Sequence, residues 1–400
     1  MAKRETSSAS SFSARRLLGQ IHLWSGLILC LPLVLIGLTG SILVFQEEID
    51  ALTNPIPHAA TGGEMQPIGT MIAVAEKALA NSAMEGRKVV AITLPQELGE
   101  PAIIRMSAPR AGGGPGSGGQ ILLDPITLGV LDIRQSGDGI MQIVHRLHAN
   151  LLIAGRDGRT IVGWLGVVML VLGASGTVIW WPRNGRWRQA FMVKWGTRPL
   201  RFNRDLHGAI GIWGLAVFMV VSFSGVYLAF PQAITAGIGS IFPARDLRSQ
   251  DMQLKASPIA GEVPLDIDQV IDLARQNAPS AVLRNIALPQ RKDQPYRLML
   301  AQPDQVDGTP LATLYIDPWS QKIFVNRSPA DYSLGESILA WQRPLHESAG
   351  LGWIWRILVF FSGLLPLLFS VTGITMWLLK RRNRKKAENQ QNKAAVAIMD

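Results

Sequence analysis

The sequence predicts a polytopic α-helical membrane protein in which four transmembrane helices form two pseudo-repeats, each with a small α+β domain outside the membrane. Three observations predict this fold class. Apolar residues make up 48% of the 400 residues and charged residues only 17%, which is unusual for a soluble protein. Four uncharged runs reach the roughly 20 residues that a helix needs to cross the hydrocarbon core. Similar landmarks recur in the same order in both halves of the chain.

The four uncharged runs mark the predicted spans. The runs themselves are residues 23–45, 160–181, 209–230 and 357–379, and transmembrane helices are predicted over residues 23–45, 159–182, 207–230 and 353–380. The segment before the first run, "MAKRETSSASSFSARR", is basic like the start of a signal peptide. The run behind it is too long for a signal peptide and has no small-residue cleavage site. We therefore expect it to be retained as the first span.

Loop charges predict the orientation, because Lys and Arg gather in cytoplasmic loops. They concentrate in three segments, 1–22, 183–206 and 381–400. These segments, with both termini, are therefore expected in the cytoplasm. The net charge of +10 follows from this pattern, so the expected partner is a lipid bilayer and no nucleic acid is needed to explain it.

The two long outer connections are predicted to fold as α+β domains over residues 46–138 and 231–340. Interfacial segments at 139–158 and 341–352 lead from them into the next span. Both domains contain a helical pattern, a strand and a strand pair around an Asp-Pro turn. These elements lie at 70–82, 88–95 and 121–133 in the first domain and at 266–279, 281–289 and 314–325 in the second. The Gly-rich stretch 109–120 matches no phosphate-binding fingerprint and is expected to connect a hairpin.

Histidines and glycines mark the internal repeat. His22 is followed after 18 positions by Gly40, and His207 after 18 positions by Gly225. His148 and His346 each follow a leucine shortly before the second and fourth spans, which contain "ASGTVIWW" and "VTGITMWL". Two spans per repeat keep both halves in the same orientation, which implies a pseudo-two-fold axis along the membrane normal.

The paired histidines are the candidate metal ligands. The single cysteine, Cys30, excludes an internal disulfide, an iron–sulfur cluster and a cysteine-based zinc site. The repeat places His22 and His207 at the cytoplasmic side and His148 and His346 at the outer side. Two neutral imidazoles from two helices are what axial ligation of a b-type haem requires. Zinc fits less well, because no carboxylate lies at ligand spacing.

The sequence pattern gives weaker evidence of a functional role for two further histidines and for the tryptophans. His145 is expected to replace His148 as a ligand, to hydrogen-bond to a ligand or propionate, or to face a substrate. His58 has no repeat mate and is expected to be structural. The tryptophans at span ends are expected to form an aromatic belt; they are Trp180, Trp181, Trp353, Trp355 and Trp377.

Four segments carry a resemblance to a known family. They are "IHLWSGLILCLPLVLIGLTGSILVFQEEID", "GRTIVGWLGVVMLVLGASGTVIWWPR", "DLHGAIGIW" and "PLHESAGLGWIWRILVFFSGLLPLLFSVTGITMWLLKRR". With this motif order, the chain resembles the PepSY-associated transmembrane family of bacterial iron-regulated membrane proteins, which includes ferric-siderophore reductases. The resemblance implies four inner-membrane spans, two periplasmic PepSY-like domains and two haems b. It carries the family's histidines over onto His22, His148, His207 and His346.

The expected function is therefore electron transfer across the bacterial inner membrane, with reduction of ferric-siderophore iron in the periplasm during iron uptake. The sequence names no electron donor, so a quinol and a cytoplasmic reductase both stay open. The alternative is a non-catalytic PepSY membrane protein that regulates a protease or senses envelope state. A transporter fits less well, because no span has an ionisable residue near its middle.

Overall fold

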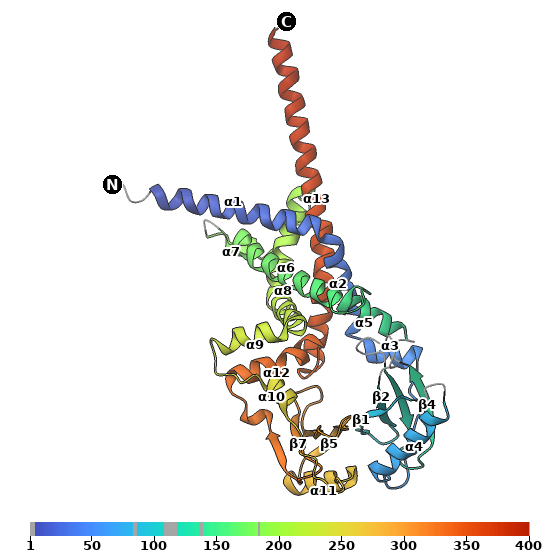
Figure 1. Cartoon of the computed structure of the whole chain (residues 1–400). Coiled ribbons are helices and arrows are strands. Elements are labelled where there is room, and N and C mark those ends of the chain that lie inside the picture. The colour runs from blue at the N-terminus through green and yellow to red at the C-terminus, as the bar shows by residue number, and fades with distance from the viewer. Residues whose placement is uncertain (1–4, 83–85, 108–117, 136–138, 183–184, 400) are drawn as a thin grey trace.

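A computed structural model of the chain combines a bundle of long helices with one antiparallel sheet (Figure 1). It describes residues 5–82, 86–107, 118–135, 139–182 and 185–399, and the backbone alone for residues 5–13 and 393–399. The long helices are α1 (Glu5–Ile28), α2 (Cys30–Leu43), α6 (Asp157–Trp180), α8 (Pro199–Ala229) and α13 (Gly352–Met399). Shorter helices are α3 (Gln46–Thr53), α5 (Ile140–Asn150), α7 (Trp187–Ala190), α9 (Pro231–Gly239), α10 (Leu247–Gln253), η1 (Pro329–Asp331) and α12 (Leu334–His346).

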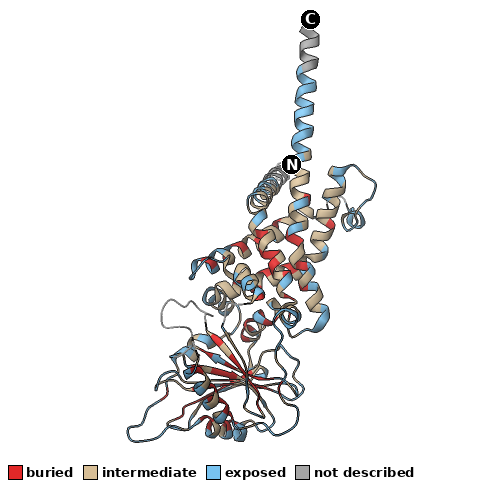
Figure 2. Cartoon of the chain, turned by 90° about the vertical axis from the view of Figure 1, so that its right-hand side faces the viewer, coloured by how far each residue is buried: buried red, intermediate tan, exposed pale blue. Residues whose placement is uncertain are grey.

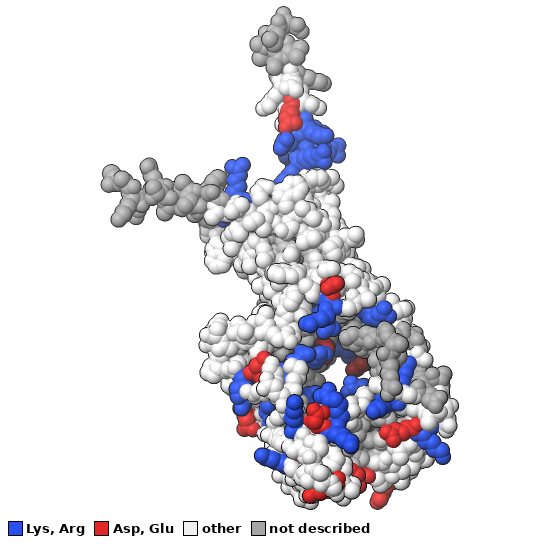
Figure 3. All heavy atoms as spheres, in the orientation of Figure 1, with Lys and Arg blue, Asp and Glu red and all other residues white. Residues whose placement is uncertain are grey.

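The long helices make this a multi-pass membrane protein. In the described part of the chain, α6, α8 and α13 are each long and apolar enough to cross a bilayer. The bent pair of α1 and α2 also passes when its two helices are taken together, which gives three to four candidate spans. In Figure 3 a band without Lys, Arg, Asp or Glu lies between the basic ends of α1 and α13 and the charged sheet region.

The first predicted span is broken rather than straight. The helix over 23–45 divides at Leu29 into α1 and α2, with a bend of 69° between them. Pro32 explains the break, because proline lacks the amide hydrogen of a helix and its ring would clash with the carbonyl of Ile28. The repeat-related position in α8 is Val217, 10 residues after His207 as Pro32 is after His22, and α8 is continuous.

Two helices extend beyond the predicted spans. α8 begins at Pro199, whereas its span was predicted from residue 207, so His207 lies two turns inside the helix. Proline suits this first turn because no amide donor is needed there. α13 continues to Met399, because the segment after the span is rich in Lys, Arg, Glu, Gln and Ala, which favour helix.

The part of the chain beyond the membrane helices forms a single eight-stranded antiparallel sheet in the order β4-β3-β2-β1-β5-β6-β7-β8. Its strands are β1 (Val89–Thr93), β2 (Ala102–Met106), β3 (Gly119–Leu123), β4 (Val130–Gln135), β5 (Val282–Ala287), β6 (Tyr296–Ala301), β7 (Ala312–Ile316) and β8 (Ile323–Arg327). The predicted strands and Asp-Pro hairpins are thereby confirmed. The two predicted α+β units lie side by side in this sheet and are joined by the β1–β5 pair. The Gly-rich stretch connects β2 to β3, and its residues 108–117 lie outside the described ones.

Two helices cover one face of the sheet. α4 (Ile68–Ala80) and α11 (Ile267–Asn277) confirm the predicted helices, and they pack with strand residues such as Ile104 and Leu298 into one apolar core (Figure 2). Burial of such side chains is the main stabilising term of a small domain. In Figures 1 and 2 both helices lie on the side of the sheet away from the membrane helices.

The Asp-Pro turns are anchored in the same way in both halves. Asp124 accepts hydrogen bonds from the amides of Ala60, Ile126 and Thr127. Asp317 accepts them from the amides of Ser257 and Trp319. Both carboxylates are buried. Through these hydrogen bonds each one connects the loop that precedes the covering helix of its half to the turn between the paired strands. Burial raises the pKa of Asp124, but the hydrogen bonds of Thr127, Ala60 and Ile126 outweigh it and hold that pKa below its usual value.

Candidate functional site: two histidine pairs

The membrane helices bring four histidines together as two pairs. The ring centroids of His22 and His207 are 6.2 Å apart with 71° between the ring planes. The centroids of His148 and His346 are 6.0 Å apart, with 42° between the planes. The rings of each pair therefore face each other in an inclined arrangement rather than stacked in parallel.

Each pair takes one histidine from each half of the chain. His22 lies on α1 and His207 on α8, which are the first long helices of the two repeats. His148 lies on α5 and His346 on α12, which precede the second long helix of each repeat. Both pairs therefore straddle the junction between the repeats, as the repeat pattern predicts.

A hydroxyl group contacts the Nδ1 atom of every paired histidine. The partners are Ser175 for His22 (3.0 Å), Thr39 for His148 (3.2 Å), Thr372 for His207 (2.8 Å) and Ser224 for His346 (3.1 Å). Nδ1 of His148 also lies 3.0 Å from the carbonyl oxygen of Ile36, and Nδ1 of His346 lies 3.1 Å from that of Val221. Nδ1 is thus occupied in all four rings, and Nε2 is the nitrogen available to a ligand.

The hydroxyl groups also fix the tautomer of the rings. Each donates its own hydrogen to a carbonyl of its helix, as Thr372 does to Leu368 at 2.7 Å and Ser175 to Val171 at 2.6 Å. A hydroxyl that has donated its hydrogen can only accept from the imidazole. Nδ1 therefore carries the hydrogen, and the lone pair of Nε2 points away from the hydroxyl, which is the arrangement that outer partners impose on metal-bound histidines.

Burial keeps the His148–His346 pair neutral. It lowers the pKa of His148 to about 3, with a further contribution from the neighbouring His346, and it also lowers the pKa of His346. Near neutral pH both rings are therefore uncharged, and a neutral imidazole is the form that binds a metal.

A glycine follows each of the four hydroxyl residues and gives the histidine ring room. A Cβ atom on Gly40 or Gly225 would lie 3.0 Å from Cε1 of His148 or His346. The same atom on Gly176 would lie 3.3 Å from Cε1 of His22. On Gly373 the corresponding distance to His207 is 4.0 Å. The steric requirement for glycine is therefore strongest beside His148 and His346.

Other predicted site features lie outside the pairs. His145 is exposed on α5, and its ring contacts neither His148 nor His346 among the described residues. His58 is exposed in the loop after α3.

The span-end tryptophans contact backbone and other side chains. Trp180 donates to the carbonyl oxygen of Ala190 and Trp355 to that of Leu345, while Arg381 lies over the ring of Trp377. Trp181 and Trp353 are exposed. In the ring contacts of the described residues, the histidine pairs touch each other and Phe369 rather than a tryptophan.

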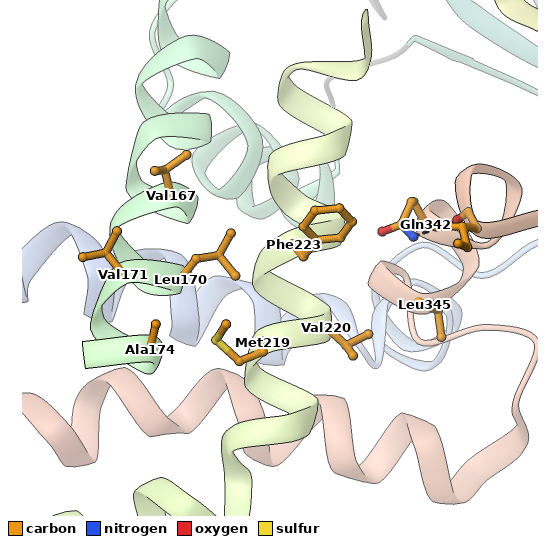
Figure 4. Close-up of a pocket in the computed structure, with 10 residues that line it drawn as sticks. Val167, Leu170, Val171, Ala174, Met219, Val220, Phe223, Gln342 and Leu345 are labelled. Atoms are coloured by element: carbon orange, nitrogen blue, oxygen red, sulfur yellow. Dashed lines mark hydrogen bonds between the residues drawn. The ribbon is translucent and has the colours of Figure 1, made fainter. Parts of the chain in front are cut away.

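An apolar pocket of about 680 Å³ lies between α6, α8 and α12 (Figure 4). Residues of α6 face residues of α8 across it, with Gln342 and Leu345 of α12 at one side. Its lining includes Ala174, the residue before Ser175, and Leu345, the residue before His346.

The four hydroxyl residues are the site residues that the sequence analysis missed. The pairs Thr39-Gly40, Ser175-Gly176, Ser224-Gly225 and Thr372-Gly373 were available as repeat landmarks. Their occurrence four times, once for each paired histidine, is the signal that could have identified them.

Fold and site together define a class: a multi-pass helical membrane protein with an antiparallel sheet beyond its membrane helices and histidines paired across an internal repeat. The family described as PepSY-associated TM region matches residues 20–380, and the chain belongs to this family. A 146-residue segment, 36% of the chain, is 28% identical to "Uncharacterized protein PA4219" of Pseudomonas aeruginosa. The match covers 35% of that relative's own length.

Proposed function

We propose that the protein is a di-haem b oxidoreductase of the bacterial inner membrane that reduces the iron of a periplasmic ferric siderophore. The spacing of the histidine pairs carries this proposal. A metal–imidazole bond is about 2.0 Å long and the ring centre lies about 1.1 Å beyond the nitrogen, so two imidazoles on opposite sides of one metal have centroids about 6 Å apart. The separations of 6.2 and 6.0 Å agree with this value.

The donor set favours haem over a bare metal ion. In the described residues no cluster of three or more His, Cys, Asp or Glu side chains could hold a metal. Zinc takes four ligands, whereas a haem iron receives its remaining ligands from the macrocycle and needs only the axial pair from the protein.

His22 and His207 would hold one haem, and His148 and His346 the other. Haem supplies one-electron redox chemistry when bound. The protein orients the four imidazoles through Ser175, Thr39, Thr372 and Ser224 and surrounds them with apolar helices. One electron from a donor, a quinol or a cytoplasmic reductase, converts the chelated Fe(III) to Fe(II). Iron is then released more readily, because hard oxygen ligands suit Fe(III) better than Fe(II).

The basic segments support the proposed orientation. The amino-terminal segment, the loop before α8 and the end of α13 carry clustered Lys and Arg, which favours a cytoplasmic location. With the bent pair of α1 and α2 counted as one span, the protein crosses the membrane four times and the sheet lies in the periplasm. The inner pair is then His22–His207 and the outer pair His148–His346.

A reduced-minus-oxidised visible spectrum of the purified full-length protein tests the proposal. A pyridine haemochrome assay gives the haem content per chain. We expect b-type bands and two haems, followed by reoxidation when a ferric siderophore is added. A colourless protein from haem-replete cells would contradict the haem assignment. Bands that persist on addition of ferric siderophores would contradict the substrate assignment.

A further inference from the structure

The sheet face opposite α4 and α11 carries a row of side chains that crosses all eight strands. Strand pairing aligns its members from β4 to β8, in the order Arg134, Gln120, Arg105, Ala91, Ala287, Arg297, Tyr315 and Val325. Residues aligned in this way project from the same face of a sheet. None of them belongs to the core beneath α4 and α11, so the row lies on the opposite face, which we name the open face. Ala91 and Tyr315 in this row are buried, whereas Arg105 and Arg297 are exposed.

The centre of the row is symmetric about the junction between the repeats. Ala91 of β1 pairs with Ala287 of β5, and these alanines are flanked by Arg105 of β2 and Arg297 of β6. Both arginines are exposed. Three strand spacings of about 4.8 Å separate them, so their Cα atoms are about 14 Å apart. Because alanine side chains are short, the surface between the two long cationic side chains is low, and we call this surface of Ala91 and Ala287 the floor.

The charges of these two arginines are not compensated within the sheet. Arg134 pairs with Asp132 and Arg327 with Asp251, and Arg284 lies 3.7 Å from Asp307. Arg105 and Arg297 form no ion pair with any residue in the described ranges. The guanidinium of Arg297 lies 6.0 Å from the ring centre of Tyr315, a contact that holds the side chain without neutralising it.

The open face looks toward the membrane helices. At one edge, Arg134 donates to the carbonyl oxygens of Asn54 and Pro55, directly after α3. At the other edge, the ion pair of Arg327 with Asp251 joins β8 to α10. The centre of the row lies between these two attachments. Figure 3 shows a hollow between the helical part and the sheet, with Lys and Arg side chains around it.

We propose that Arg105 and Arg297 bind an anionic, multidentate Fe(III) chelate over the floor of Ala91 and Ala287. Arginine donates paired, charge-assisted hydrogen bonds to anionic oxygens. The site and the His148–His346 pair both lie at the junction between the two repeats. The identity of the ligand as an iron chelate rests on the proposed function, and the site adds the charge class of the substrate.

Binding of redox-inert gallium(III) chelates to the full-length protein in nanodiscs tests this site. The probes are a gallium tris-catecholate, which is anionic, and a gallium tris-hydroxamate with a free amine, which is cationic. We expect tighter binding of the tris-catecholate, weakened about tenfold by Arg105→Gln or Arg297→Gln and about a hundredfold by both. Arg275→Gln, on α11 beyond the opposite face, is the matched control and should bind as the wild type does.

A second variant guards against misfolding of the arginine variants. Ala287→Leu keeps both arginines but places a larger side chain between them. It should therefore weaken binding of the tris-catecholate while the thermal stability stays unchanged. Three results would overturn the proposal. The wild type could bind the two gallium probes equally well, the double variant could bind the tris-catecholate as tightly as the wild type does, or inorganic phosphate could displace the tris-catecholate at matched ionic strength. Gallium is not reduced, so a failed haem assay with intact chelate binding would refute the proposed function alone.

Discussion

A methyl group at Gly225 would meet the ring of His346, whereas one at Gly373 would barely reach that of His207. The distances from the added Cβ to Cε1 are 3.0 and 4.0 Å, and 3.0 Å is closer than carbon atoms pack without displacement. We predict that Gly225→Ala displaces His346 and removes the outer haem. Gly373→Ala is the matched control and should retain both haems. The haem content per chain, measured by pyridine haemochrome, checks this, and equal haem loss in both variants would contradict it.

The hydroxyl of Thr372 orients His207 through a 2.8 Å contact with Nδ1. Thr372→Val keeps the shape of the side chain and removes this partner. Loss of such an outer partner typically weakens metal binding about 10- to 100-fold. We therefore predict faster haem loss from the inner pair and a shifted midpoint potential, whereas Thr372→Ser should behave as the wild type does. Transfer of haem to apomyoglobin and a redox titration measure the two effects.

At the scale of elements, the first turn of α12 depends on one carboxylate. Glu336 is buried, completes a capping box with Ser333 and accepts hydrogen bonds from the side chain of Arg245. The bonds from Arg245 are the main cause that lowers the pKa of Glu336 to about 2. Because the folded pKa lies below the usual value of 4.5, this carboxylate stabilises the fold above pH 4.5, and its contribution is lost as the pH falls toward 2.

We predict that Glu336→Gln lowers the stability of the full-length protein at pH 7 by about 1–3 kcal/mol, the range for hydrogen bonds to charged groups. The difference between variant and wild type should shrink as the pH falls from 4.5 toward 2. Thermal unfolding at pH 7 and pH 3, followed by tryptophan fluorescence, measures this. Arg384→Gln is the control, because its pair with Glu388 is exposed near the end of α13. A difference that stays constant with pH would contradict the assignment.

Several elements could be predicted from the sequence because their patterns are local. The helices α4 and α11 and the strands around Asp124 and Asp317 lie where the alternation of apolar residues placed them. The ladder between β1 and β5 joins residues almost 200 positions apart, and no local pattern specifies such a pairing. A long apolar run predicts one continuous helix, so this pattern does not predict the break at Leu29, although Pro32 lies within the run. The repeat pattern predicts the four candidate histidine ligands. Their hydroxyl partners are identified only by the way in which the helices pack in the structure.

At the scale of the whole molecule, each histidine pair combines the two halves of the chain. We predict that His22→Ala and His207→Ala remove the same spectral component, and that His148→Ala and His346→Ala both remove the other. His145→Ala should keep both components, because its ring lies outside the pairs. Difference spectra of the five variants test this. Loss of a component in His145→Ala but not in His148→Ala would overturn the outer pairing.

The β1–β5 ladder gives the single chain the symmetry of a homodimer. An antiparallel pair of repeat-related strands is what two identical subunits form when they meet on a two-fold axis. The histidine pairs are arranged about the same junction. Because both halves belong to one polypeptide, they need not be identical. The bend at Leu29 in one half, where the other half has the continuous helix α8, is such a difference.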